Sequence, residues 1–329
     1  RRRACAAPPG SAEAHRHHAA QAAMKLVINS AYGYLGAGPM ALFADRRAAD
    51  EVTRRGRDIL ERVVAGLRER GLALLEADTD GVFFAVPEGW DEGDERACVA
   101  AIGATLPAGL ALEYEGRYRA MLSHEVKNYA LLTYDGRLLV RGNAFQSSRT
   151  EPFGARFLDA ALRCALAGDG AGVRRAYLET VAAVRERRLA PAEVATVTRL
   201  TKTPEEYARS RTTAREAAYE ALLGAGRTRW RPGERVRHYR ASDGAAMWLP
   251  EVAGDDGPRP SESGAAERAG RAGSPYDVAH YLGVLRTTYV ARLRKAFAPD
   301  DFAQLFRPSG QVGLFDRPLA AIEPRWIRA

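Results

Sequence analysis

The pattern of hydrophobic and polar positions divides the chain into two parts of different character. Residues 48–70 carry apolar side chains at helical spacing, which predicts a long amphipathic helix closed by Gly71. Two short apolar runs follow, at 72–77 and 82–86, and the acidic residues between them predict a β-hairpin with an exposed tip. From about residue 152 onward, helical patterns dominate.

Further elements follow from the same patterns. Helices are predicted at 21–30, where the chain then meets several glycines and Pro39, and at 95–106, 155–167, 172–187, 204–223 and 276–297. Strands are predicted at 110–114, 129–134 and 138–141, the last two joined as a hairpin through Asp135 and Gly136. Together these elements indicate an α+β fold: an antiparallel sheet packed on helices, followed by a mostly helical domain.

Composition and charge narrow the class of protein. A length of 329 residues fits two or three domains at roughly 100–200 residues each. The three cysteines are widely spaced and odd in number, so neither a disulfide framework nor a zinc site is expected. No apolar run approaches the ~18 residues of a membrane helix, so we expect no membrane partner and a cytoplasmic location. The net charge of +8 permits a polyanionic partner.

The hairpin tip carries the strongest local signal for chemistry. Asp78 and Asp80 are one residue apart, and two carboxylates this close can both approach a hard divalent cation such as Mg²⁺. Without a cation they would repel each other. An Asp-x-Asp sequence is also good turn chemistry for a solvated loop, so both readings stay open from the residues alone.

A narrow polar stripe marks the helix predicted at 21–30. Gln21, Lys25, Asn29 and Tyr32 recur every three or four residues and share one face, whereas the rest of the helix is apolar or small. A surface helix has a wider polar face, so we expect the stripe to meet a polar ligand. A lysine extended along the surface and an amide that satisfies a neighbouring loop are the alternative.

Three motifs in chain order resemble family B DNA polymerases. The segment from Lys25 to Gly33 matches the K-x-x-x-N-S-x-Y-G signature of that family. Asp78-Thr79-Asp80 then stands where the family has its D-T-D-S motif. Lys127 and Tyr129 follow where its K-x-Y motif belongs. The resemblance covers essentially the whole chain and suggests a bacterial type.

The resemblance implies a role for each motif residue. Lys25 would neutralise the triphosphate of an incoming deoxynucleotide, and Asn29 and Tyr32, on one face with Gln21, would line its pocket. Asp78 and Asp80 would hold two Mg²⁺ ions for nucleotidyl transfer to a primer 3′-hydroxyl. Lys127 and Tyr129 would contact the primer–template duplex.

The resemblance also implies a division of the chain. Residues 1–33 would end the fingers and 34–150 would form the palm. Residues 151–305 would form the thumb, with a flexible loop at 254–274 that is rich in Gly, Ser, Pro and charge, and 306–329 would be a C-terminal tail.

Two departures from the family pattern matter. Gly81 replaces the serine that commonly follows the second aspartate, which keeps the tight turn and loses a hydroxyl. Nothing before Lys25 matches the upstream D-x-x-S-L-Y-P motif, which carries the other essential carboxylate. One Mg²⁺ ligand is therefore missing, and we expect the chain to be a C-terminal segment that does not extend a primer alone. The Ala-, Arg- and Gly-rich composition suggests a GC-rich bacterial genome. As a bacterial DNA polymerase, the protein would be cytoplasmic and associated with the nucleoid.

Two shorter patterns leave alternatives open. Gln311, Leu314 and Phe315 resemble the Q-x-x-L-F peptide that bacterial replication proteins insert into the sliding clamp, although the Leu-Phe pair could instead pack on the thumb. His15, His17 and His18 resemble a metal cluster, but the absence of a carboxylate partner favours a loop at the tip of the fingers.

Three functions remain open on this basis. The first is a DNA-directed DNA polymerase segment, and the second is a non-catalytic DNA-binding remnant of one, which the absent carboxylate would permit. The third is an unrelated Mg²⁺ enzyme, such as a nucleotide-sugar transferase, which leaves the polar stripe and the K-x-Y motif unexplained.

Overall fold

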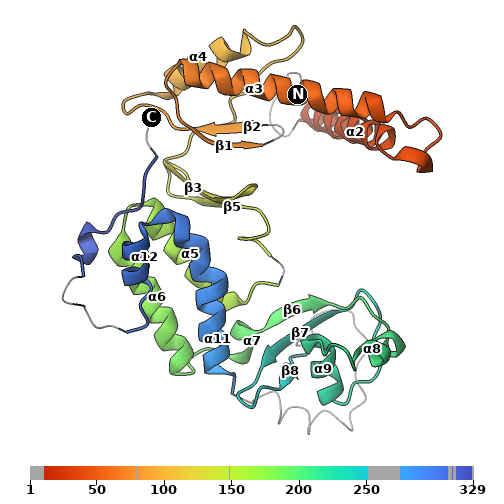
Figure 1. Ribbon diagram of the computed structural model, residues 1–329, viewed down its shortest axis with the longest axis vertical. Coiled ribbons are helices and arrows are strands. Elements are labelled where there is room, and N and C mark those ends of the chain that lie inside the picture. The colour runs from red at the N-terminus through yellow and green to blue at the C-terminus, as the bar shows by residue number, and fades with distance from the viewer. Residues whose placement is uncertain are drawn as a thin grey trace. The chain divides into compact units, whose positions relative to one another are not determined.

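The computed structural model describes residues 11–78, 81–147, 149–250, 275–309, 313 and 316–327 (Figure 1). The chain forms two compact units, one reaching to Tyr114 and the other spanning Glu115–Ile327. Each unit has its own arrangement of helices and antiparallel strands, and the element labels below are those of Figure 1.

Two long helices begin the first unit. Helix α2 (Ala12–Leu35) starts at Ser11, whose hydroxyl accepts a hydrogen bond from the Ala14 amide. After a short 3₁₀ turn, η1 (Gly38–Met40), helix α3 (Arg46–Glu69) starts at Asp45, whose carboxylate caps the Ala48 amide in the same way. Val63 and Leu67, in the second half of the apolar face of α3, are buried in the core of this unit, whereas Val52 near its start is exposed.

A hairpin and a third helix pack on α3. Strands β1 (Leu74–Asp78) and β2 (Gly81–Phe84) pair in antiparallel fashion, and helix α4 (Glu92–Gly103) follows, starting with a capping box formed by Asp91 and Asp94. The small core of this unit contains Val63, Leu67, Leu72, Cys98 and Ile102.

The second unit begins with a three-stranded antiparallel sheet. Its strands β3 (Ala120–Glu125), β4 (Asn128–Leu132) and β5 (Leu138–Arg141) are neighbours in chain order, joined by tight turns. Ala130 at the centre of β4 is fully buried, because helix α5 (Pro152–Leu166) covers the sheet.

Helices form most of the core of the second unit. Helix α5 packs against α6 (Gly170–Arg185), and a later helical run packs on both. That run comprises α11 (Val278–Val284), the π-helical η3 (Leu285–Tyr289) and the 3₁₀ segment η4 (Val290–Ala296), and α12 (Pro299–Leu305) and the short η5 (Leu319–Ala321) follow it. Tyr276 secures the start of the run by donating a hydrogen bond to the Val184 carbonyl at 3.0 Å.

A second sheet with its own small core completes this unit. Strands β6 (Thr196–Arg199), β7 (Arg235–Arg240) and β8 (Ala246–Trp248) are antiparallel, and the short helix α7 (Pro191–Val194) precedes them. Helices α8 (Pro204–Ser210) and α9 (Ala217–Gly224) cover one face of the sheet. The buried core between helices and sheet contains Leu200, Tyr207, Ala218, Tyr219, Leu222, Trp230 and Val236.

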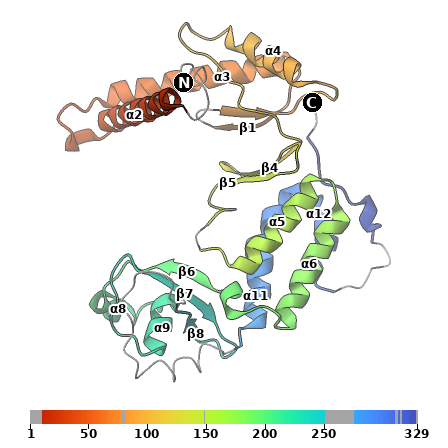
Figure 2. The same ribbon diagram turned by 180° about the vertical axis from the view of Figure 1, so that it is seen from behind.

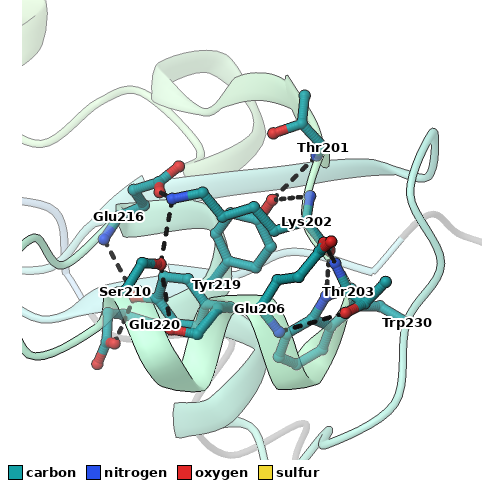
Figure 3. A network of polar contacts seen from close by, with 10 residues as sticks. Thr201, Lys202, Thr203, Glu206, Ser210, Glu216, Tyr219, Glu220 and Trp230 are labelled. Atoms are coloured by element: carbon teal, nitrogen blue, oxygen red, sulfur yellow. Dashed lines mark hydrogen bonds and ion pairs between the residues drawn. The ribbon is translucent and has the colours of Figure 1, made fainter.

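A polar network ties this helical layer together (Figure 3). The Tyr219 hydroxyl accepts hydrogen bonds from the backbone amides of Thr201 and Lys202, both at 2.9 Å. The Lys202 ammonium pairs with Glu216 at 2.5 Å, and the Trp230 indole donates to the Lys202 carbonyl at 3.0 Å. The loop that leads into α8 is therefore fixed from three sides.

The α+β class with antiparallel sheets is confirmed, as are the amphipathic helix, the acidic hairpin and β5. Two element predictions are wrong: residues 110–114 are not a strand, and the helix predicted at 204–223 is two helices separated by a turn. The mostly helical second part also contains the sheet β6–β8, which was not predicted. Strand β3 was not predicted, and the two hairpins of the predicted palm belong to separate sheets.

The predicted division into fingers, palm and thumb stays a prediction. The boundary between the compact units, at Tyr114, lies inside the range 34–150 given to the palm. The loop at 254–274 lies outside the described residues. No helix in the described part of the chain is long and apolar enough to cross a membrane.

Candidate functional site

The four residues of the polar stripe all lie on α2. Lys25 and Asn29 are exposed, and Gln21 is partly buried. Tyr32 is 46% exposed, and its hydroxyl shares a 2.8 Å hydrogen bond with the hydroxyl of Thr53 on α3. One end of the stripe therefore meets the neighbouring helix, and its middle faces solvent.

The apolar residues of α2 are exposed as well. Met24, Val27 and Ile28 are 59%, 60% and 61% exposed, and Lys25 and Asn29 are exposed as well. The three apolar side chains share one face of the helix, being spaced i, i+3 and i+4, and Leu26, which is 69% exposed, lies on another side. A helix that is apolar on several sides is normally enclosed, so the exposed apolar surface of α2 is unusual for a surface helix.

Asp78 is the last residue of β1. It is half-buried and lies opposite Gly81, the first residue of β2, so it stands at the tip of the hairpin as predicted. Asp80, together with Thr79, lies outside the described residues. The glycine at position 81 is compatible with this tight connection between the two strands.

Helix α2 and the acidic hairpin belong to the same unit and both pack on α3. In Figures 1 and 2 the hairpin lies near the end of α2 at Ala12, and the helix then runs away from it toward Leu35. The structure thus joins the two motifs through α3, and their convergence on one nucleotide stays a prediction.

The family implies Mg²⁺ ions, which need several oxygen donors around one point. Carboxylate oxygen is the donor that Mg²⁺ prefers, and Asp78 supplies one at a hairpin tip. Within the described ranges, however, no group of three His, Cys, Asp or Glu side chains gathers around a common point. The carboxylate of Asp78 is therefore a suitable donor for Mg²⁺, but the described residues supply too few donors to form a complete metal site. The histidines 15, 17 and 18 lie in α2 and not in a loop, since Ser11 starts the helix before them.

The K-x-Y motif forms the turn between β3 and β4 in the second unit. Lys127 is exposed and adopts the left-handed backbone conformation, with φ of 64°. Tyr129 is half-buried on β4 and pairs with Arg141 on β5. Both residues therefore stand at one end of the three-stranded sheet.

The C-terminal motif residues Gln311, Leu314 and Phe315 lie outside the described residues. The residues on either side of them are firmly held. Arg307 pairs with Asp316 through two hydrogen bonds of 2.6 and 2.9 Å, and the buried Arg174 donates to the carbonyls of Leu305, Arg307 and Ser309.

The structure reveals a basic surface that the sequence analysis missed. Arg199 on β6 stands directly opposite Arg235 on β7, and Arg237 stands opposite Val197 on the same face of the sheet. This is the face that α8 and α9 leave uncovered. In the described part of the chain, no ion pair neutralises any of these three guanidinium groups. Like charges directly opposite each other across two strands destabilise a sheet, so the arrangement favours an anionic partner.

A signal for this surface was present in the sequence. The run from Arg235 to Arg240, R-V-R-H-Y-R, alternates basic residues with Val236 and His238, which are buried. Such alternation is typical of a strand with one buried and one charged face.

An α+β fold that carries the lysine-bearing helix motif, the acidic hairpin and the K-x-Y turn in this chain order defines a polymerase-like protein. The family model described as DNA polymerase family B matches residues 10–239, and the chain belongs to this family.

Curated relatives are DNA polymerases of archaea. DNA polymerase 1 of Pyrococcus abyssi is 36% identical over 125 residues, which is 37% of this chain and 16% of the relative. The DNA polymerase of Methanocaldococcus jannaschii is 31% identical over 191 residues, or 54% of this chain and 11% of the relative. The chain therefore matches less than a fifth of either relative's length.

The fold is similar to a solved structure, that of the family B DNA polymerase from the hyperthermophilic archaeon Pyrobaculum calidifontis. The TM-score is 0.59 at 22% sequence identity, over 88% of this chain and 35% of that one. The similarity supports the fold, and these relatives give no support to the bacterial type that the sequence analysis expected.

Proposed function

We propose that this chain is part of a DNA-directed DNA polymerase and that it acts in template-directed transfer of deoxynucleotides to a primer 3′-hydroxyl. The observation that carries the proposal is the family match over residues 10–239, which includes all three motifs in their family order. The chain spans less than a fifth of either curated relative described above, so their activity comes to this chain as a proposal.

The nucleotide would be bound by the polar stripe of α2. Lys25 is an exposed ammonium and can meet the phosphates as a point charge. Asn29 is one turn further along, and Tyr32 offers an aromatic ring for the sugar or base. For Tyr32 to turn toward a nucleotide, its hydroxyl would give up the hydrogen bond to Thr53.

Asp78 and Asp80 would hold Mg²⁺, with a further carboxylate from outside the motifs seen here. When bound, a pair of such ions activates the attacking hydroxyl and stabilises the leaving pyrophosphate. The role of the chain is to present oxygen donors on a short, paired hairpin, where Asp78 is held by the β1–β2 ladder. This fixed position limits the reorganisation needed when the ions bind.

The primer–template duplex would be bound through phosphate contacts. Lys127 and Tyr129 at the end of the β3–β5 sheet supply one contact, and the arginine face of Arg199, Arg235 and Arg237 supplies another. Such contacts are independent of base sequence and strongly dependent on salt, which suits the net charge of +8.

A sliding clamp is a further partner in this proposal, bound through Gln311, Leu314 and Phe315. The support is the motif itself and the two arginine-centred anchors, Arg174 and Arg307, which hold the chain on either side of it. The cytoplasmic, nucleoid-associated location and the replicative or repair role follow from the polymerase proposal alone.

A second function has a specific observation in its favour, the exposed arginine face of Arg199, Arg235 and Arg237. A non-catalytic DNA-binding remnant of a polymerase would keep this basic surface and need no complete set of metal ligands. Both functions predict DNA binding, and only the first predicts nucleotide binding at α2.

The test is a pair of binding measurements on the chain of 329 residues. We expect the wild-type chain to bind a labelled primer–template duplex and, separately, a deoxynucleoside triphosphate with Mg²⁺, measured by fluorescence anisotropy. Lys127→Ala should weaken only duplex binding and Lys25→Ala only nucleotide binding, so each variant is the control for the other.

Loss of both activities in either variant, or no duplex binding by the wild type, would contradict the polymerase proposal. Duplex binding without nucleotide binding would favour the remnant. We expect no primer extension by this chain alone, and extension would show that the ligand set is complete after all.

A further inference from the structure

The turn that carries Lys127 has an uncommon backbone conformation. Lys127 has φ of 64°, and Arg187 is the one other non-glycine residue with positive φ in the described part of the chain. Glu125 pairs with Asn128, so Val126 and Lys127 form the tight connection between β3 and β4. A glycine or asparagine would adopt this conformation more easily than a lysine does.

Gly142 lies next to this turn, on the side where β5 pairs with β4. This glycine follows Arg141 at the end of β5 and has φ of 89°. A Cβ atom at position 142 would lie 2.2 Å from the Lys127 carbonyl oxygen and 2.8 Å from the Asn128 Cα. Both are backbone atoms, so they could not move aside without shifting the turn.

Asn128 connects the same elements through its side chain. Its amide oxygen accepts a 2.7 Å hydrogen bond from the Ala144 backbone amide, and its amide nitrogen donates to the Val126 carbonyl at 3.0 Å. One side chain thus holds the residue before Lys127 and the segment after Gly142 at a fixed separation.

We propose that Gly142 and Asn128 are positioning residues that hold Lys127 in its left-handed conformation and so direct its ammonium to a phosphate of the bound duplex. The inference rests on the proposed function, in which Lys127 contacts primer–template DNA. Strained residues persist where their surroundings over-determine them, and such residues gather at functional sites. Here the surroundings are Gly142 and Asn128, whose contacts described above are with the backbone on either side of Lys127 and with its carbonyl oxygen.

The geometry explains why two separate residues are needed. The direction of the Cα–Cβ bond of Lys127 depends on its φ, so a turn that relaxed to negative φ would send the ammonium elsewhere on the surface. Gly142 makes room for the turn, and Asn128 closes it. Because Tyr129 pairs with Arg141, the same arrangement also fixes the second residue of the motif.

The experiment measures duplex affinity at several salt concentrations for the full chain and its variants. Gly142→Ala should weaken binding and lower the slope of log affinity against log salt by about one phosphate contact, as Lys127→Ala does. Gly136→Ala is the matched control, because Gly136 also has positive φ, 82°, in a turn of the same sheet, yet a Cβ there would meet nothing within 4 Å. It should leave the salt slope unchanged.

A double-variant cycle separates positioning from general damage. In the Lys127→Ala background, Gly142→Ala should cause no further loss, since the contact it positions is already gone. Asn128→Ala should give the same pattern, and it removes hydrogen bonds without adding an atom. Asn128→Ala therefore still tests the positioning role if circular dichroism shows that Gly142→Ala does not fold.

Different results would contradict the positioning role of Gly142 and Asn128 and the proposed function of the chain. Wild-type affinity in both Gly142→Ala and Asn128→Ala, with Lys127→Ala weakened, would overturn the positioning role and leave the proposed function intact. Fully additive losses in the double variants would also overturn it. Absence of duplex binding in the wild type, or no effect of Lys127→Ala, would overturn the proposed function and this inference with it.

Discussion

Arg199 on β6 lies directly opposite Arg235 on β7, and both side chains are exposed on the sheet face opposite the one that α8 and α9 cover. Evolution of a strand pair for stability alone would place opposite charges at such a site. The two like charges repel each other across the strand pair, so the arrangement favours stabilisation by an anion.

Arg199→Glu should therefore separate stability from binding. The new cross-strand pair with Arg235 should stabilise the sheet by ~0.5 kcal/mol, because a repulsion becomes an attraction that water partly screens. Duplex affinity should fall at the same time, and its salt dependence should become shallower. Urea unfolding and anisotropy titrations measure the two effects.

Arg209→Glu is the charge-matched control for this prediction. Arg209 lies on α8, which covers the opposite face of the sheet. The same change in net charge at Arg209 should lower duplex affinity much less. Equal losses at the two positions would mean that net charge, and not the arginine face, determines binding.

Tyr219→Phe should weaken the polar network drawn in Figure 3. The Tyr219 hydroxyl accepts from two backbone amides, those of Thr201 and Lys202, and the ring itself is buried. Removal of the hydroxyl leaves both amides without an acceptor, which should cost about 1–3 kcal/mol of unfolding free energy. Tyr134→Phe, at an exposed tyrosine, should cost almost nothing. Similar effects of the two variants would contradict the network's importance.

Elements set by local signals could be predicted from the sequence. The bounds of β5 agree with its prediction because a turn at Asp135 and Gly136 precedes a short apolar run, and Gly136 adopts the positive φ that such a turn needs. The hairpin tip at Asp78 was predicted on the same grounds.

Elements that depend on pairing between segments far apart in the chain could not be predicted from the sequence. Strand β6 has four residues and gains its partner from β7, which lies far along the chain, so its short run gave no local signal. The helix predicted at 204–223 is interrupted after Ser210, where Tyr207 and Glu220 bond to each other across the turn. Tertiary contacts of this kind override a helical pattern.

The residues of the candidate site also differ in whether they could be predicted from the sequence. The resemblance of three local motifs to the family pattern identified Lys25, Asp78 and Lys127. The role of Gly142 could not be read from the sequence, because its backbone contact with Lys127 depends on the register of two hairpins. The arginine face likewise required the cross-strand register.

His238 should make the stability of the β6–β8 layer dependent on pH. Burial lowers the pKa of this imidazole below its ordinary value of 6.5, and its Nε2 shares a 3.0 Å hydrogen bond with Thr198. Because the unfolded chain then binds the proton more readily, stability is full above pH 6.5 and falls as the pH drops below it. Urea unfolding followed by tryptophan fluorescence measures this, since Trp230 and Trp248 lie in this layer.

His238→Gln keeps a hydrogen-bonding atom toward Thr198 and removes the titration. The loss of stability between pH 7 and pH 5 should therefore be smaller in this variant than in the wild type. His18→Gln, at an exposed position on α2 outside this layer, is the control for the substitution of a histidine elsewhere. If His238→Gln follows the wild-type curve, proton uptake at His238 does not drive the change.

Gly154 on α5 should not tolerate a methyl group. A Cβ at this position would lie 2.1 Å from two atoms of the Tyr289 ring. The ring cannot easily retreat, because its hydroxyl accepts a 3.0 Å hydrogen bond from the Glu151 amide and donates one to the Glu151 carboxylate. Gly154→Ala should therefore cost about 1–3 kcal/mol through overpacking, although alanine is the better helix former.

The control for this prediction is Gly283→Ala on α11, where a Cβ would meet nothing within 4 Å. That variant should raise the unfolding free energy by up to about 1 kcal/mol, because it gains helix propensity without a clash. Thermal unfolding followed by circular dichroism should thus move the two midpoints in opposite directions. A shift of both midpoints upward would show that Tyr289 can yield, and that the contact between α5 and η3 is looser than its hydrogen bonds indicate.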